Sequence, residues 1–174
     1  VAGDITQQKT INAIVKQIGE RKVTGLVQNA GRITPMLPIT EMPIEAFKSV
    51  NELNLEAPIV LFQALQSQLA GGRVLHISSL MAHVPAHSWG AYCISKAGLF
   101  MIYQILKKEC PETVFGSVMP GVTDTDMQAL IREAEAMPEA ERAFFQNLHQ
   151  SQQLLAPEVV GQFLAWLLLD VSAT

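Results

Sequence analysis

The chain has 174 residues, a length that suits a single domain with a sizeable core. Hydrophobic residues make up 49% of it and charged residues 16%, a balance that excludes a disordered chain. The net charge of −4 argues against binding to nucleic acid or to an anionic membrane surface.

Two cysteines are present, and no apolar run approaches the roughly 18 residues that a membrane span needs. Cys93 and Cys110 are too few for a disulfide framework and lack the spacing of metal ligands. We therefore expect a cytoplasmic protein with no metal ion and no membrane segment.

Helical and extended patterns alternate along the chain. Apolar residues at helical spacing predict helices at 7–18, 44–69, 89–109 and 157–169, and short apolar runs predict strands at 23–28, 73–78 and 113–119. Pro58 predicts a break in the second helix near Glu56–Ala57. This order predicts one α/β domain over 1–174, with a parallel sheet covered by helices on both faces.

Region 126–153 differs from the rest because it is rich in Glu and Gln and its helical periodicity is broken. It follows the carboxyl end of the predicted strand 113–119, where inserted segments commonly close over a ligand. We interpret it as a substrate lid.

A serine, a tyrosine and a lysine recur in a pattern that suits proton transfer. Tyr92 and Lys96 are four positions apart near the start of the predicted helix 89–109, so they share one helix face. Ser79 lies thirteen residues before the tyrosine, in the loop after strand 73–78. A hydroxyl, a phenol and an ammonium that converge can run acid–base chemistry on a carbonyl or an alcohol.

Five motifs follow one another in the chain, each at the end of a predicted element or at the predicted helix break. They are N-A-G (29–31), N-L-E-A-P (54–58), I-S-S (77–79), Y-C-I-S-K (92–96) and P-G-V-T-D-T (120–125). Together they resemble the short-chain dehydrogenase/reductase family, which implies a Rossmann-like, doubly wound parallel sheet. W-G-A-Y-C (89–93), T-D-T-D-M-Q (123–128) and L-L-A-P-E (154–158) resemble its sepiapterin reductase and benzil reductase branch.

The resemblance implies four catalytic residues. Tyr92 would be the general acid/base, Lys96 would favour the phenolate and bind the nicotinamide ribose, and Ser79 would hold the substrate oxygen. Asn54 would order a water beside the lysine. Ser78 competes with Ser79, which could also simply start a turn, and Tyr92 with Lys96 could be an ordinary, partly exposed helix pair. Asn51 competes with Asn54, and Asn54 could instead be a cap at the helix break.

For the cofactor, the resemblance implies contacts to the adenine, the ribose and the nicotinamide. The matching residues are Asp4, Ile5, Asn29, Ala30, Gly31, Tyr92, Lys96, Pro120, Gly121, Val122 and Thr125. Pro120-Gly121 as a plain turn and Thr125 as a helix cap are the alternatives. The branch resemblance favours NADP(H) over NAD(H).

Substrate contacts are expected from Ser79, Tyr92 and Trp89, although Trp89 fits plain packing equally well. His76 alternates within a strand and is interpreted as a satisfied core or interface histidine rather than a ligand. The expected reaction is hydride transfer from NADPH to a ketone or diketone of a small molecule. A homodimer or homotetramer would form through helices 44–69 and 89–109.

The family's glycine-rich G-x-x-x-G-x-G turn does not occur in the sequence. Compared with the family, the first two strands and the last strand are missing, so the sequence is either partial or a degenerate fragment. We favour a partial sequence, because strand 23–28 would otherwise expose a sticky apolar edge. The alternative function is a non-catalytic relic that acts as an interaction or regulatory subunit.

Overall fold

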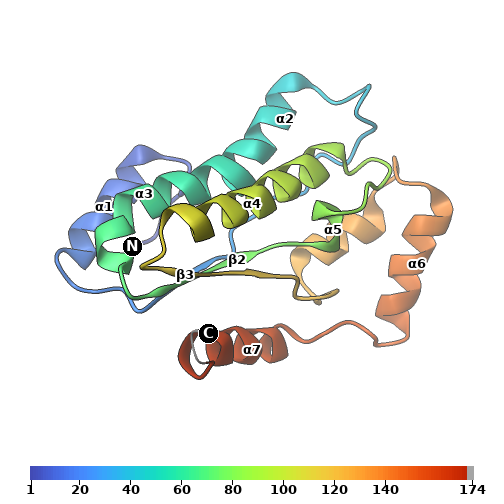
Figure 1. Cartoon of the computed structure of the whole chain (residues 1–174). Helices are drawn as coiled ribbons and strands as arrows, with labels where there is room; N and C mark the ends of the chain where they lie inside the picture. The colour runs from blue at the N-terminus through green and yellow to red at the C-terminus, as the bar shows by residue number, and fades with distance from the viewer. Residues whose placement is uncertain (172–174) are drawn as a thin grey trace.

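The computed structural model describes residues 1–171. Within them the sheet has three parallel strands in the order β1 (Gly25–Gln28), β2 (Arg73–Ile77) and β3 (Val114–Val118). Helices α3 (Ala57–Leu69) and α4 (Gly90–Glu109) cover one face of it, and α7 (Pro157–Leu169) covers the other (Figure 1). The predicted α/β fold with a parallel sheet between helices is confirmed.

Each strand is one or two residues shorter than predicted, and residues that precede β1 and β3 bond to the end of α3 instead. The N–H of Val23 donates to the carbonyl of Gln68 at the end of α3, at 2.9 Å. The hydroxyl of Thr113 donates to the carbonyl of Leu69, at 3.2 Å. These bonds fix the amino ends of β1 and β3 against the same helix terminus.

The predicted helix 44–69 is continuous but changes its geometry. After α2 (Ile44–Asn51) the chain makes a π-helical turn, η1 (Glu52–Glu56), and α3 begins at Ala57. The predicted break near Glu56–Ala57 is therefore corrected to the preceding turn. Pro58 accounts for it, since a proline has no N–H to offer the carbonyl four residues earlier, that of Asn54.

Alternate residues of β2 point into two cores. Val74 joins Leu65, Leu69 and Phe115 in the core under α3, to which α1 (Gln8–Ile18) contributes Ile11. Leu75 and Ile77 pack with Val118 against the inner side of α7. Arg73 ties that helix to the sheet, because its Nη1 donates to the carbonyl of Leu167 at 2.7 Å.

His76 faces the same side of the sheet as Val74, in contact with the ring of Phe115 at 6.3 Å between centroids. Burial lowers its pKa to about 4, so the ring is neutral at physiological pH. Its predicted position in the core is confirmed, and the backbone of Leu99 opposes the lowering of its pKa, although neither ring nitrogen has a well-formed hydrogen bond within residues 1–171.

The predicted lid region forms two helices, α5 (Asp126–Glu133) and α6 (Glu139–Gln150), beyond the carboxyl end of the sheet (Figure 1). Ile131 of α5 and Met137 of the connecting loop are buried in a third apolar cluster that includes Tyr92. The cluster therefore joins the lid region to the start of α4.

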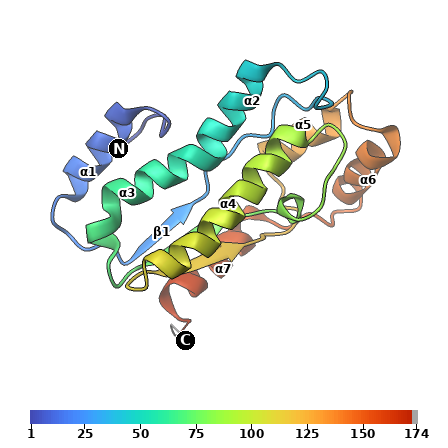
Figure 2. The same cartoon turned by 45° about the horizontal axis from the view of Figure 1, so that its top comes forward.

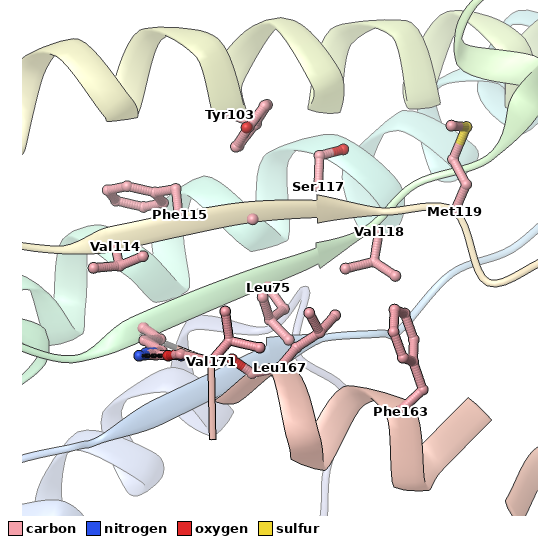
Figure 3. Close-up of a pocket in the computed structure, with 12 residues that line it drawn as sticks. Leu75, Tyr103, Val114, Phe115, Ser117, Val118, Met119, Phe163, Leu167 and Val171 are labelled. Atoms are coloured by element: carbon pink, nitrogen blue, oxygen red, sulfur yellow. Dashed lines mark hydrogen bonds between the residues drawn. The ribbon is translucent and has the colours of Figure 1, made fainter. Parts of the chain in front are cut away.

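A cavity of about 520 Å³ follows the outer edge of β3, between Tyr103 of α4 and Phe163 of α7 (Figure 3). Within residues 1–171 its walls carry no carboxylate, imidazole or thiol, and Arg73 at its end donates to the carbonyls of Leu167 and Val171. The cavity is thus an open sheet edge rather than a site for acid–base chemistry.

No helix within residues 1–171 is long and apolar enough to cross a bilayer.

Candidate active site

The carboxyl ends of the three strands meet at one edge of the sheet. Gln28, His76 and Ser117 stand side by side in the register of the strands. Loops 29–31, 78–79 and 119–125 leave from this edge, where open parallel sheets bind ligands. Figure 2 shows α4 running alongside the rod formed by α2 and α3, with its amino-terminal end next to α5.

Tyr92 lies in the first turn of α4 and is 7% exposed. Burial raises the pKa of its phenol above the ordinary value, and the neighbouring Ser79 side chain opposes that shift. Of the two candidate serines, Ser79 is therefore the one beside the phenol, while the buried hydroxyl of Ser78 has no partner within residues 1–171. The phenol stays protonated at neutral pH.

Lys96 reaches the sheet from the next turn of α4, and its Nζ lies 5.6 Å from the centroid of the Tyr92 ring. The ammonium donates to the carbonyl of Ile77 at 2.7 Å, which uses one of its three donors. Burial lowers the pKa of Lys96 to about 8. We expected its charge to favour the phenolate, but the largest influence on the Tyr92 pKa is burial, which raises it.

Asn54 lies in the π-helical turn and is buried. Its Nδ2 donates to the carbonyl of Arg32 (2.8 Å) and to Oγ of Ser95 (2.9 Å), while its Oδ1 accepts from the N–H of Arg32 (2.7 Å). These bonds connect η1 to the loop after β1 and to α4, so the side chain is not a helix cap. The rival Asn51 bonds within its own helix, to the carbonyl of Phe47.

Gly31 brings the loop 29–31 close to both the Asn54 amide and the Lys96 ammonium. A Cβ placed on it would stand 3.6 Å from Oδ1 of Asn54 and 3.7 Å from Nζ of Lys96. The absence of a side chain at this position keeps the space beside the amide and the ammonium open. The N-A-G loop therefore passes over the same pair that the motif pattern predicted to work together.

Sequence reasoning missed two buried residues that hold the site in place. Ser95 donates to the carbonyl of Tyr92 at 2.8 Å and accepts from Asn54, so it fastens the π-helical turn to α4. Gln28 donates from Nε2 to the carbonyl of Pro58 at 2.8 Å. The sequence gives a weak indication of each. Ser95 lies inside the motif Y-C-I-S-K, and Gln28 is a polar residue at the end of an apolar strand.

Asp4 and Ile5, the predicted adenine contacts, lie near the π-helical turn. The carboxylate of Asp4 accepts from the N–H and the hydroxyl of Thr6, both at 2.9 Å, and these bonds lower its pKa. Ile5 packs against the core under α3 and lines a small cleft with Glu52 and Glu56. Ile5 thus borders η1, the turn that carries Asn54, and Asp4 precedes it in the chain.

The loop 120–125 is braced by the segment that precedes α7. The N–H of Leu155 donates to the carbonyl of Val122, and the N–H of Asp124 donates to the carbonyl of Leu155, both at 2.9 Å. Gly121 has a φ of +80°, which fits a tight turn after Pro120. Thr125 occupies the position before α5, yet its hydroxyl donates to the carbonyl of Thr123 and makes no cap bond.

Trp89 connects the tyrosine to the lid region. Its ring meets that of Tyr92 edge to face, with 5.9 Å between centroids, and stacks on Phe145 of α6 at 5.8 Å. Ile33 and Met36 complete an apolar surround. On this side of the phenol a substrate would meet aromatic and aliphatic side chains.

Residues 1–136 match the family model for short chain dehydrogenases. The chain therefore belongs to the short-chain dehydrogenase/reductase family of oxidoreductases, as its parallel sheet and its Ser79, Tyr92 and Lys96 indicate.

Its relatives include reductases of defined substrates. Benzil reductase ((S)-benzoin forming) of Bacillus cereus is 35% identical over 160 residues, which cover 86% of this chain and 64% of that enzyme. Sepiapterin reductase of Rattus norvegicus is 43% identical over 82 residues, 47% of this chain and 31% of that enzyme. The crystal structure of the KRED1-Pglu enzyme matches with a TM-score of 0.94 and 35% identity, over 99% of this chain and 75% of that one.

Proposed function

We propose that this protein reduces the carbonyl group of a small ketone or diketone, with Tyr92 as the general acid. The observation that carries the proposal is the buried phenol, which stays protonated at neutral pH and lies beside both Ser79 and Lys96. A relative whose name is benzil reductase supports a carbonyl as the reacting group.

A nicotinamide cofactor fits the residues at the carboxyl edge of the sheet. Two ammonium donors of Lys96 are left for ribose hydroxyls, and Gly31 leaves room beside them. The loops 29–31 and 120–125, together with Asp4 and Ile5, would hold the rest of the cofactor. When bound, the reduced cofactor supplies a hydride to the carbonyl carbon. The branch resemblance favours NADPH.

The protein's own part of the reaction is the transfer and stabilisation of a proton. Ser79 donates a hydrogen bond to the substrate oxygen and orients it toward Tyr92, whose hydroxyl then gives its proton to that oxygen. The Lys96 ammonium stabilises the phenolate that forms. A positioned acid contributes roughly 10²- to 10⁴-fold to the rate.

The lid region would exclude water during this step. Phe145 and Ile131 reach the cluster around Tyr92 from α6 and α5, and a closed apolar surround strengthens the interactions of the lysine charge. Opening of these helices would admit the substrate and release the product.

The proposal is tested by supplying benzil and sepiapterin with NADPH and with NADH, and by following oxidation of the cofactor. We expect reduction of at least one substrate, faster with NADPH. Titration of the protein with each cofactor accompanies the assay. Absence of both turnover and cofactor binding would contradict the proposal and support the non-catalytic alternative.

A further inference from the structure

A single side-chain hydrogen bond joins the lid region to the loop before α4. The hydroxyl of Ser88 in that loop donates to the carbonyl of Ala136, between α5 and α6, at 2.6 Å. Apart from the first turn of α5, which bonds to Thr125, no other hydrogen bond links 126–153 to the rest of residues 1–171. Without it, apolar contacts alone would hold the lid region at the start of α4.

The backbone of Ser88 takes a conformation that serine rarely adopts. Its φ is +65°, in the left-handed region, and the residue is 4% exposed. Glycine enters this region without steric cost, whereas a serine stays there only where its surroundings hold it. The hydroxyl is what a serine offers at this position and a glycine lacks, so the bond to Ala136 is the feature that accounts for it.

The neighbouring His87 fixes the direction of this hydroxyl. Its Nδ1 lies 2.8 Å from Oγ of Ser88. A serine hydroxyl has one proton and the carbonyl of Ala136 can only accept, so the proton points to the carbonyl and Nδ1 donates to the oxygen. One orientation of the hydroxyl therefore serves both partners, and that orientation holds the lid region.

Both bonded residues are followed in the chain by one that packs around the acid. Met137, which follows Ala136, is 3% exposed in the apolar cluster that contains Tyr92. Trp89, which follows Ser88, belongs to the same cluster. The hydrogen bond thus lies one residue away from the contacts by which the lid region covers the phenol.

We propose that Ser88 is a positioning residue, which holds the lid region closed over the active site through its bond to Ala136. When this bond breaks, α5 and α6 can leave the cluster around Tyr92, and when it forms again the site is closed. The inference rests on the proposed function, because the closed lid serves the reaction only if the site reduces a carbonyl. The closure itself is measurable without substrate.

Limited trypsin digestion of the full chain measures how often the lid region opens, because cleavage of a transiently opened segment follows the population of its open form. The lid helices contain two trypsin sites, Arg132 and Arg142, and Lys107 and Lys108 at the end of α4 report on the rest of the protein. Ser88→Ala removes the hydroxyl and keeps the backbone conformation equally unfavourable. We expect about three- to tenfold faster cleavage in the lid helices, the effect of one neutral hydrogen bond, and unchanged cleavage in α4.

Ser151→Ala is the matched control. The hydroxyl of Ser151 also donates to a carbonyl at 2.6 Å, that of Asn147, but both residues belong to the lid region. This variant should be cleaved like the unaltered protein. Ser88→Gly is the second test variant, since it removes the same hydroxyl and relieves the left-handed strain. It should open the lid region as Ser88→Ala does, with no loss of stability elsewhere.

The fluorescence of Trp89 gives a second readout, because its ring stacks on Phe145 of α6. The other tryptophan, Trp166, is exposed on α7 and is removed in a Trp166→Phe background. In that background, Ser88→Ala and Ser88→Gly should shift the emission to longer wavelength and increase its quenching by acrylamide.

Unchanged emission and unchanged cleavage in the lid helices would overturn the inference. Equal acceleration of cleavage in the lid helices and in α4 of both variants would also overturn it, since the hydroxyl of Ser88 would then stabilise the whole fold. If the lid region opens as expected but the unaltered protein reduces no carbonyl, the proposed function fails while the closure by Ser88 stands.

Discussion

Burial shifts two titratable groups of the site in opposite directions, and both shifts have consequences for reduction. The Tyr92 phenol is kept protonated, as a proton donor must be. The pKa of Lys96 is lowered to about 8, so most of the ammonium charge is present at pH 7 and is lost as the pH rises through about 8. The charge that stabilises a phenolate is therefore available only on the acid side of that value.

The rate of reduction should accordingly depend on pH through Lys96. We expect kcat/KM to fall as the pH rises through about 8, because the neutral amine no longer stabilises the phenolate. Lys96→Arg is the control, since arginine keeps its charge and should give a lower but flat profile between pH 7 and about 9.5. A profile of the unaltered protein that is flat over this range would refute the assignment.

Spacing along the chain predicted which residues of the site meet, but not which hydrogen bonds hold them in place. Ser79 lies beside Tyr92 and Lys96 lies one turn from it, as the motif spacing indicated. Ser95 and Gln28 were missed because their bonds reach 41 and 30 residues along the chain. The net direction of the Tyr92 pKa also depends on burial, which the sequence alone does not reveal.

Among the elements, the π-helical turn is the one that positions the site. Glu52–Glu56 inserts an irregular turn into an otherwise long helix and carries Asn54 to the loop after β1 and to α4. A proline was enough to predict an interruption, but not its type or its exact place. Helical periodicity cannot separate an α-helix from a single π-helical turn, because the shift amounts to one residue.

Pro58→Ala tests this role of the turn. Alanine restores an N–H that can bond to the carbonyl of Asn54, so the helix should regularise and move Asn54 away from Arg32 and Ser95. We expect kcat to fall by about tenfold while the free energy of unfolding changes by about 1 kcal/mol or less. Kinetics and urea denaturation measure the two quantities.

Pro157→Ala is the matched control, since that proline occupies the first turn of α7 and none of the bonds that hold Asn54 involves that helix. It should leave kcat unchanged. An equally active Pro58→Ala protein would show that the π-helical turn is not needed to place Asn54.

For the whole molecule, the distribution of apolar surface suggests self-association. The large apolar residues of α3 are mostly buried by its own chain, but α4 exposes Ile94, Met101 and Ile105 along one side. Residues seven and four positions apart fall on one helix face, as in helix pairs that pack together. We propose that two copies pair through α3 and α4.

Light scattering of the unaltered protein and of Met101→Glu tests the pairing. The glutamate places a charge in the middle of the apolar stripe, so we expect a dimer or tetramer for the unaltered protein and smaller species for the variant. Leu130→Glu, an equally polar change at an exposed position of α5, should leave the assembly intact. A monomeric unaltered protein would exclude the interface.

The layered architecture of the molecule could be predicted from the order of the elements. Alternation of strands and helices gave the parallel sheet, and the carboxyl-edge loops followed from it. The lid helices could not be delimited, because the polar region 126–153 owes its order to a few buried residues such as Ile131 and Met137. The cavity along β3 depends on tertiary packing between α4 and α7 and carries no sequence motif.

Substitution of Tyr92 by phenylalanine tests its role as the proton donor, since it removes one hydroxyl and keeps the ring against Trp89. We predict that NADPH-dependent reduction of the best carbonyl substrate falls by roughly 10²- to 10⁴-fold, while cofactor binding and the melting temperature stay close to those of the unaltered protein. Reduction at an undiminished rate by Tyr92→Phe would show that Tyr92 is not the general acid.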